Sequence, residues 1–178
     1  MTDRLTKSDW IEHGLAVLAS EGPNALKIGA LAEQLDVSRG SFYWHFEDLA
    51  DFRSELLQSW QESSTDRIIR DLEVRRGERD RLKRLMRGAF RGSRNLDRAI
   101  RSWAAEDRGV AAVVASVDAR RVAGLVKLLV EAGVIGECAV ARATFLYWAY
   151  LGQVLVVNPR HDSISTASLD EIVGLFES

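Results

Sequence analysis

The segment DVSRGSFYWHF, residues 36–46, places five aromatic residues in a row behind a short run of small polar ones. A core strand, an aromatic substrate site and a helix that reads nucleic acid could each use such a segment. At about 100° per residue, a helix through this segment puts Phe42 and Phe46 on one buried face and turns Tyr43, Trp44 and His45 outward. Exposed aromatic side chains are typical of interaction sites, which favours the third alternative.

The residues before this helix predict a second short helix and a tight turn. Apolar spacing predicts a helix over 28–35, and residues 36–38 leave room only for a tight turn before the next helix, 39–45. Ser38 is expected to cap this helix with its hydroxyl, and the residue before Ser38 has the spacing of a hydrophobic staple to Phe42. Two short helices joined in this way predict a helix-turn-helix, whose second helix enters the major groove of DNA.

Helices are also predicted on both sides of this motif. Thr6 and Asp9 have the spacing of a capping box for a helix over 7–21. Asp48 is expected to cap a long helix over 49–74. Further helices are predicted over 79–91, 95–105, 108–132, 137–157 and 166–177, with breaks at Gly77, Gly92-Ser93, Gly133 to Gly136 and Asn158-Pro159.

Helical spacing recurs along the chain, and no long alternation or hairpin-turn signal predicts strands. The expected fold class is therefore all-α, with about nine helices. We expect two domains: a three-helix helix-turn-helix domain over 1–50, and a C-terminal helical domain for ligand binding and dimerisation over 51–178.

Composition narrows the class of protein. Of 178 residues, 47% are hydrophobic and 28% charged, which is typical of a folded globular protein. The single cysteine, Cys138, excludes an internal disulfide, suits a cytoplasmic protein, and is expected to be a small buried thiol. The start, MTDRLTKSDW, lacks the apolar run of a secretion signal, and the longest apolar run, 143–157, favours a buried or interface helix over a membrane span.

The residue types do not form the spacing of a catalytic nucleophile or a metal site, so we expect no enzyme activity, metal or cofactor. Net charge is −2. Residues 1–50 carry four Lys or Arg and eight Asp or Glu, and are therefore acidic. Residues 67–108 carry fourteen Lys or Arg and seven Asp or Glu, and are therefore basic. The basic segment is either a solvated helix face or a phosphate-binding patch.

Residues 8–52 resemble the N-terminal DNA-binding domain of TetR-family transcriptional regulators, through IGALAEQLDVS, SFYWHF and the long helix that follows. The resemblance implies a homodimer that binds palindromic double-stranded operator DNA, with later helices that dimerise and bind a small effector. The expected function is a ligand-responsive repressor released by an apolar or aromatic molecule. The alternative is a TetR-like dimer that has weak or lost DNA binding and acts through ligand or protein contacts.

The family's DNA contacts fall on the start of the second helix and along the third. They are Lys27, Gly29, Arg39, Gly40, Ser41, Tyr43, Trp44 and His45. Arg39 could contact a guanine edge or a phosphate. Tyr43 and His45 could donate hydrogen bonds to phosphate oxygens. Lys27 stands where the family often has a capping Thr or Ser, and Leu49 where a Lys often meets the DNA backbone. These departures, together with the excess of acidic residues in this domain, predict a modest affinity for DNA. They also predict that this affinity depends only weakly on salt concentration.

Aromatic and apolar residues on the later helices predict two further sites, although both patterns are also those of plain core. The effector pocket is expected among Trp60, Phe90, Arg94, Arg101, Trp103, Tyr147 and Tyr150. The dimer interface is expected from Val122, Leu125, Leu129, Phe145, Trp148, Leu151 and Leu155, as a four-helix bundle between subunits.

Overall fold

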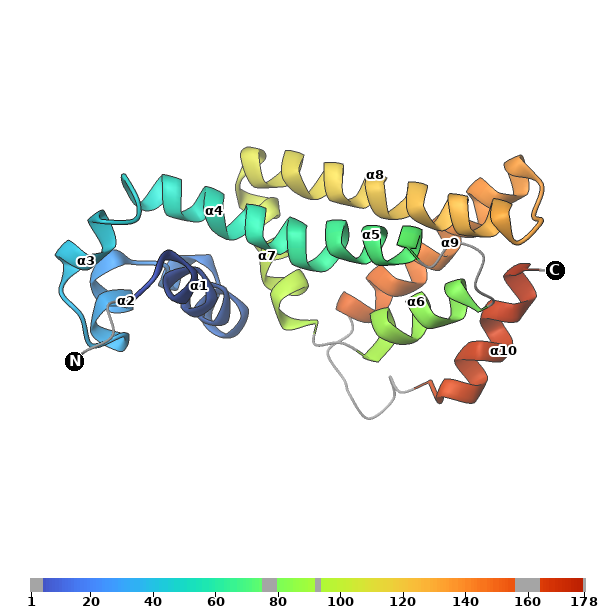
Figure 1. Cartoon of the computed structure of the whole chain (residues 1–178), viewed down its shortest axis with the longest axis horizontal. Coiled ribbons are helices and arrows are strands. Elements are labelled where there is room, and N and C mark those ends of the chain that lie inside the picture. Colours follow the sequence, from blue (N-terminus) through green and yellow to red (C-terminus); the bar gives the residue numbers. More distant parts are fainter. Residues whose placement is uncertain (1–4, 75–79, 92–93, 156–163, 178) are drawn as a thin grey trace. The chain divides into compact units, whose positions relative to one another are not determined.

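The computed structural model describes residues 5–74, 80–91, 94–155 and 164–177, and these ranges contain helices and no strand (Figure 1). The all-α prediction is confirmed. The breaks predicted at Gly77, Gly92-Ser93 and Asn158-Pro159 lie outside the described residues.

The helices begin and end close to the predicted residues. They are α1 Lys7–Glu21, α2 Ile28–Gln34, α3 Arg39–Tyr43, α4 Leu49–Gln61, α5 Arg67–Val74, α6 Arg81–Arg91, α7 Asn95–Glu106, α8 Arg108–Glu131, α9 Gly136–Leu155 and α10 Thr166–Glu177. A short 3-10 turn, η1, covers Pro23–Ala25. The largest difference in the first fifty residues is in α3, which ends two residues before its predicted end.

The predicted helix over 49–74 is helical throughout, but it is not a uniform α-helix. Between α4 and α5 the backbone forms a π-helical segment, η2, over Glu62–Asp66. Within it the Ser63 hydroxyl donates to the Ser59 carbonyl at 2.8 Å, and the Ser64 hydroxyl donates to the Trp60 carbonyl at 2.5 Å. Such hydroxyls compete for helix carbonyls and loosen the regular hydrogen-bond pattern.

The chain divides into two compact units. The first comprises residues 1–64 and 95–114, and the second comprises 65–94 and 115–178. The first unit therefore contains α7 and the start of α8 together with the N-terminal helices. This grouping by contacts differs from the predicted functional division at residue 50, which stays a prediction.

In the first unit, an aromatic cluster fixes the N-terminal helices. Trp10 meets Phe42 edge-on at a centroid distance of 5.3 Å, and Phe52 lies 5.4 Å from Phe42 and 4.9 Å from Phe46. Gly14 allows this approach, because a Cβ there would lie 2.5 Å from Phe52 Cζ. Burial of each large apolar side chain stabilises the fold by about 1.5–3 kcal/mol.

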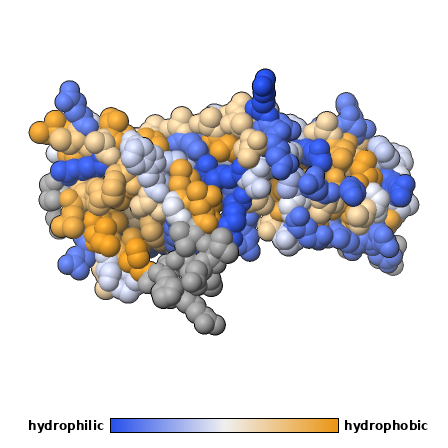
Figure 2. Space-filling view, turned by 180° about the vertical axis from the view of Figure 1, so that it is seen from behind, coloured by the Kyte–Doolittle hydropathy of each residue, from blue (hydrophilic) through white to orange (hydrophobic). Residues whose placement is uncertain are grey.

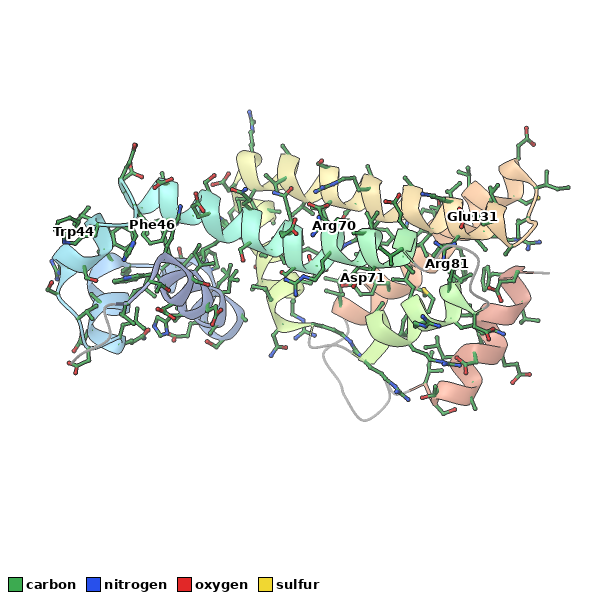
Figure 3. All side chains as sticks on the ribbon, viewed as in Figure 1. Trp44, Phe46, Arg70, Asp71, Arg81 and Glu131 are labelled. Carbon is green, nitrogen blue, oxygen red and sulfur yellow. The ribbon has the colours of Figure 1, made fainter. Side chains whose placement is uncertain are left out.

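In the second unit, α6, α8, α9 and α10 enclose a separate apolar core that includes Leu129, Ala143 and Val173. Arg81 is buried at its edge, where it pairs with Glu131 and donates to the Leu72 carbonyl (Figure 3). A buried guanidinium is tolerated when such partners compensate its charge.

The placement of Cys138 differs from the prediction. The thiol lies exposed in the first turn of α9 and is not a buried core group, because the residue that enters the core at this point is Ala139. Among the described residues, no helix is long and apolar enough to cross a membrane, and no cluster of His, Cys, Asp and Glu could hold a metal ion.

Candidate functional site

The turn between α2 and α3 orients the two helices of the motif. Leu31 and Ala32 bury one face of α2. The backbone N–H of Val37 donates to the Ala32 carbonyl at 3.0 Å, and Asp36 takes a positive φ of 53°. Asp tolerates this left-handed conformation better than most residues. The turn therefore covers the four residues 35–38, one more than predicted, because α2 ends at Gln34.

The aromatic run divides between two environments, as predicted. Phe42 and Phe46 are 0% and 2% exposed, whereas Tyr43 and Trp44 are 59% and 74% exposed. Figure 3 shows Trp44 directed away from the helices and Phe46 directed toward them. Exposure of two adjacent large aromatics on one short helix is a feature of a binding surface.

Two details of α3 differ from the predictions. The Ser38 side chain makes no capping hydrogen bond, and its backbone carbonyl instead accepts from the N–H of Ser41 at 3.0 Å. His45 does not face outward with Tyr43 and Trp44, because α3 has ended and the ring Nε2 donates to the Leu5 carbonyl at 3.0 Å. The predicted phosphate contact of His45 stays a prediction, and in this structure its Nε2 is used within the unit.

The basic residues near the turn lie on α2 and at the start of α3. Lys27 is the exposed N-cap of α2 and makes no side-chain capping bond, as its chemistry predicts. Arg39 begins α3, and its guanidinium lies against Gly29, where a Cβ would be 2.8 Å from Nη2. Gly40 and Ser41 follow on the same short helix, exposed and half-buried respectively.

Acidic side chains of the N-terminal helices accept hydrogen bonds from backbone N–H groups near the starts of α1 and α4. The side chain of Asp48 accepts from the N–H of Asp51 at 2.8 Å, and the side chain of Asp51 accepts from the N–H of Glu47 at 3.0 Å. Thr6 and Asp9 form the predicted capping box, and the Thr6 hydrogen bonds lower the pKa of Asp9. The segment 39–45 itself contains no carboxylate, so the negative balance of the N-terminal residues does not fall on the outward face of α3.

The comparisons with known proteins identify the N-terminal domain. Residues 11–55 match the family model of bacterial regulatory proteins of the tetR family. Residues 11–55 therefore form a DNA-binding domain of the tetR type. A curated relative, the HTH-type transcriptional regulator AcrR of Shigella flexneri, is 30% identical over 69 residues, which cover 39% of this chain and 30% of that regulator. The match thus spans less than a third of the relative's length.

Two solved structures share the fold of this chain. One, named as that of a transcriptional regulator from Streptomyces coelicolor A3(2), has a TM-score of 0.65 at 16% identity and covers 97% of this chain and 98% of its own. The other, named as that of a TetR-family transcriptional regulator from Rhodococcus sp., has a TM-score of 0.63 at 19% identity over 96% of each chain. At these identities the likeness establishes the fold alone.

In the first unit, the predicted effector residues Trp60, Arg101 and Trp103 contact other side chains of the unit. Trp60 is 1% exposed, and its indole N–H donates to Asp97 at 3.1 Å. Arg101 Nε lies 3.5 Å from the other oxygen of Asp97. The ring of Trp103 is buried beneath the guanidinium of Arg53, whose Cζ lies 5.6 Å from the ring centroid. Trp60 and Trp103 are buried with these partners and Arg101 is half-buried, and an effector role for the three residues stays a prediction.

A cavity of about 250 Å³ lies elsewhere in this unit. None of the predicted effector residues lines it. Its lining comes from the end of α1, from η1 and from α7, through Leu18, Ala19, Gly22, Pro23, Asn95, Arg98, Ala99 and Ser102.

In the second unit, two predicted effector residues belong to a polar aromatic cluster. Tyr147 stacks on Tyr150 with ring centroids 5.9 Å apart, and its hydroxyl donates to Asp118 at 2.6 Å. Arg121 lies over the Tyr150 ring at 5.6 Å, and its Nε donates to Thr65 at 3.0 Å. The sequence prediction missed Asp118 and Arg121, although both stand on one face of α8, three residues apart.

The other two predicted effector residues of this unit, Phe90 and Arg94, are joined by a hydrogen bond to a backbone carbonyl. Arg94 Nη2 and Gln153 Nε2 each donate to the Phe90 carbonyl at 3.0 Å. Arg94 Nε and Gln153 Oε1 are buried and make no hydrogen bond among the residues that the structure describes. A buried donor and a buried acceptor without partners are available to a bound molecule. Gln153 was not predicted from the sequence.

The predicted dimer residues fall into two groups. On α9, Phe145, Trp148 and Leu155 are 58%, 65% and 61% exposed, and Leu151 is half-buried. On α8, Leu125 and Leu129 are buried in the core of their own unit, and Val122 packs against that core. The interface prediction is therefore corrected for α8, since its apolar stripe is already covered by α6 and α9 side chains.

The exposed apolar side chains of α9 have neighbours of the same kind. Val140 of α9 and Ile172 and Leu175 of α10 are 52%, 41% and 69% exposed, and the ring of Phe145 stacks on that of Phe176 at 5.7 Å. Apolar surface gathers over the part of the molecule that contains these helices, at the left of Figure 2. Contiguous apolar surface of this kind is typical of interaction sites, and a dimer interface here stays a prediction.

Proposed function

We propose that this chain is a homodimeric transcriptional repressor of the TetR family that reads operator DNA with α3 and is released by a small effector. The observation that carries the proposal is the outward face of α3. There Tyr43 and Trp44 are exposed beside Arg39 and Ser41, without an acidic side chain, on a helix fixed from beneath by Phe42.

In a helix-turn-helix, the second helix lies in the major groove while the first crosses the DNA backbone. Here α3 is the second helix. Ser41 offers a hydroxyl to a base edge or a phosphate, and Tyr43 offers a hydroxyl to a phosphate. The indole of Trp44 offers apolar surface to a thymine methyl or a sugar. Gly40 leaves the DNA free to approach the helix backbone closely.

A palindromic operator requires two copies of α3 about 34–36 Å apart, and therefore a dimer. The exposed apolar residues of α9 and α10 support a dimer built through these helices. A second copy of the chain would bury the exposed rings of Phe145 and Trp148, which this single chain leaves in water.

For the effector, the cluster in the second unit is the better candidate. Tyr147, Tyr150 and Phe90 supply aromatic surface, and Arg94 and Gln153 supply polar atoms without partners. This combination suits a small, mostly apolar or aromatic molecule with one or two polar groups. Its binding would favour a dimer in which the recognition helices no longer match successive major grooves.

Fluorescence anisotropy tests the proposal. Labelled fragments of the source genome, including the region upstream of the regulator's own gene, are titrated at a stated salt concentration with a scrambled duplex beside them. Wild type is expected to bind one fragment much more tightly than the scrambled duplex. The Tyr43→Ala/Trp44→Ala variant should lose this preference, while Val74→Ala, which truncates an exposed side chain on α5, should retain it.

If no fragment is preferred by wild type, DNA recognition through α3 is excluded. The alternative supported by the acidic N-terminal residues, a helical dimer that acts through ligand or protein contacts, would then replace it.

A further inference from the structure

Arg39 is held against a glycine on the neighbouring helix. A Cβ added to Gly29 would lie 2.8 Å from Arg39 Nη2 and 3.2 Å from both Cζ and Nε. These three atoms are in the guanidinium, so the whole charged group lies over the first turn of α2. Real Cβ atoms essentially never come within 3.0 Å of such a neighbour. Any other residue at this position would therefore displace the guanidinium.

The contact turns Arg39 away from the rest of its own helix. At about 100° per residue, Arg39 and Tyr43 project from α3 only about 40° apart. Tyr43 follows this direction outward and is 59% exposed. The guanidinium of Arg39 instead folds back onto α2, which is the helix that crosses the DNA backbone in this motif.

The group is also chemically available. Arg39 makes no hydrogen bond or ion pair within the described part of the chain, and neither does Lys27, which precedes Gly29 by two residues. The charged groups of Arg39 and Lys27 therefore both lie at the start of α2, without an acidic partner among the described residues. A guanidinium offers two parallel N–H donors to a phosphate, and an ammonium offers a point charge.

We propose that Gly29 is a positioning residue that seats Arg39 as a phosphate-binding group beside Lys27, and that base reading falls to Ser41, Tyr43 and Trp44. The inference rests on the proposed DNA binding. Phosphate contacts fix the orientation of a protein on the duplex and supply salt-dependent affinity, whereas base-edge contacts supply sequence preference. Arg39 would then contribute to affinity for any duplex and not to the choice of operator.

The test compares Arg39→Ala, Gly29→Ala and the double variant on the preferred fragment and on the scrambled duplex, over a series of salt concentrations. Arg39→Ala is expected to weaken binding to both duplexes by the same factor. It should also make the slope of log K against log salt shallower by about 0.9 for each phosphate that the variant no longer binds. Gly29→Ala should produce a smaller change of the same kind, because its methyl group moves the guanidinium without removing it.

The double variant shows whether Gly29 acts through Arg39. It is expected to bind no more weakly than Arg39→Ala alone. Gly88→Ala is the matched control, because Gly88 lies in α6 and a Cβ there meets nothing within 4 Å. It should bind both duplexes as wild type does, and melting temperatures of all variants should not fall below that of wild type by more than the control's change.

Three results would overturn the inference while the proposed function stands. They are a loss confined to the preferred fragment, a relaxed preference at one base pair in Arg39→Ala, or additive losses in the double variant. A wild-type protein that prefers no fragment would instead overturn the proposed function, and this inference with it.

Discussion

At the scale of single residues, Asp97 is a buried acidic residue that contacts two other side chains of the first unit. It is 6% exposed and accepts a hydrogen bond from the Trp60 indole at 3.1 Å while pairing with Arg101. Asp97→Ala leaves a buried N–H and a half-buried guanidinium without this partner, and we expect a loss of about 2–3 kcal/mol in the free energy of unfolding. Urea unfolding measures it.

Asp97→Asn is the matched variant, because an amide oxygen can still accept from the indole. It should lose less stability than Asp97→Ala. Equal losses would show that the hydrogen bond to Trp60 contributes nothing and that only the charge of Asp97 matters.

A second residue-scale prediction concerns pH. Arg87 donates two hydrogen bonds to Asp170, at 2.6 and 2.5 Å, and these bonds lower the pKa of Asp170 below its ordinary value of 3.8. Because the folded pKa is the lower one, the pair stabilises the fold above the unfolded pKa, and this contribution disappears as pH falls through the folded value. The effect is modest because the pair is partly exposed.

Melting temperatures measured from about pH 7 down to about pH 3 check this sign. Asp170→Asn should be less stable than wild type at neutral pH and should lose less on acidification. Glu171→Gln, a neighbouring exposed carboxylate, serves as the control and should follow wild type throughout. A parallel acid response in wild type and Asp170→Asn would exclude the pair as its source.

The sequence predicted that Phe42 and Phe46 bury and that Tyr43 and Trp44 stay exposed, because that division follows from helical periodicity; it placed His45 outward, whereas the structure turns it to the Leu5 carbonyl. It did not predict how Arg39 folds back or which side chain the Trp60 indole contacts. Each depends on one partner, Gly29 or Asp97, and periodicity within a helix does not specify contacts between helices.

At the scale of elements, the helix starts differ in how they are capped. Asp48 accepts a hydrogen bond from the Asp51 N–H at the start of α4, whereas Ser38 makes no such bond at the start of α3. Asp48→Ala is expected to lower the free energy of unfolding by about 1 kcal/mol. Ser38→Ala should change it by less than about 0.5 kcal/mol. Urea unfolding of both variants is the measurement, and similar losses would contradict this assignment of caps.

Helix positions were well predicted from sequence, since α1 begins and ends at the predicted residues and α8 differs by one residue at its end. The π-helical segment over Glu62–Asp66 was missed, because serine hydroxyls compete for carbonyls only once the helix exists. The interface role predicted for Leu125 and Leu129 was wrong for a related reason. Apolar spacing on α8 shows that one face is buried, but it does not say whether the same chain or a second copy buries it.

At the scale of the whole molecule, the remaining question is what covers the exposed apolar side chains of α9 and α10. Trp148 is 65% exposed, and a glutamate in its place would put a charge where a second copy must exclude water. We therefore expect sedimentation equilibrium to show a dimer for wild type and a monomer for Trp148→Glu. The monomer should also bind the preferred DNA fragment more weakly, since a palindrome needs two recognition helices held together.

Val74→Glu is the matched control. Val74 is 86% exposed but lies on α5, outside the apolar residues of α9 and α10, so the same substitution there should leave the dimer intact. A Trp148→Glu protein with the mass of wild type would remove α9 from the interface. A dimer that breaks without any loss of DNA affinity would instead show that one copy of α3 suffices, which would contradict the palindromic operator in the proposed function.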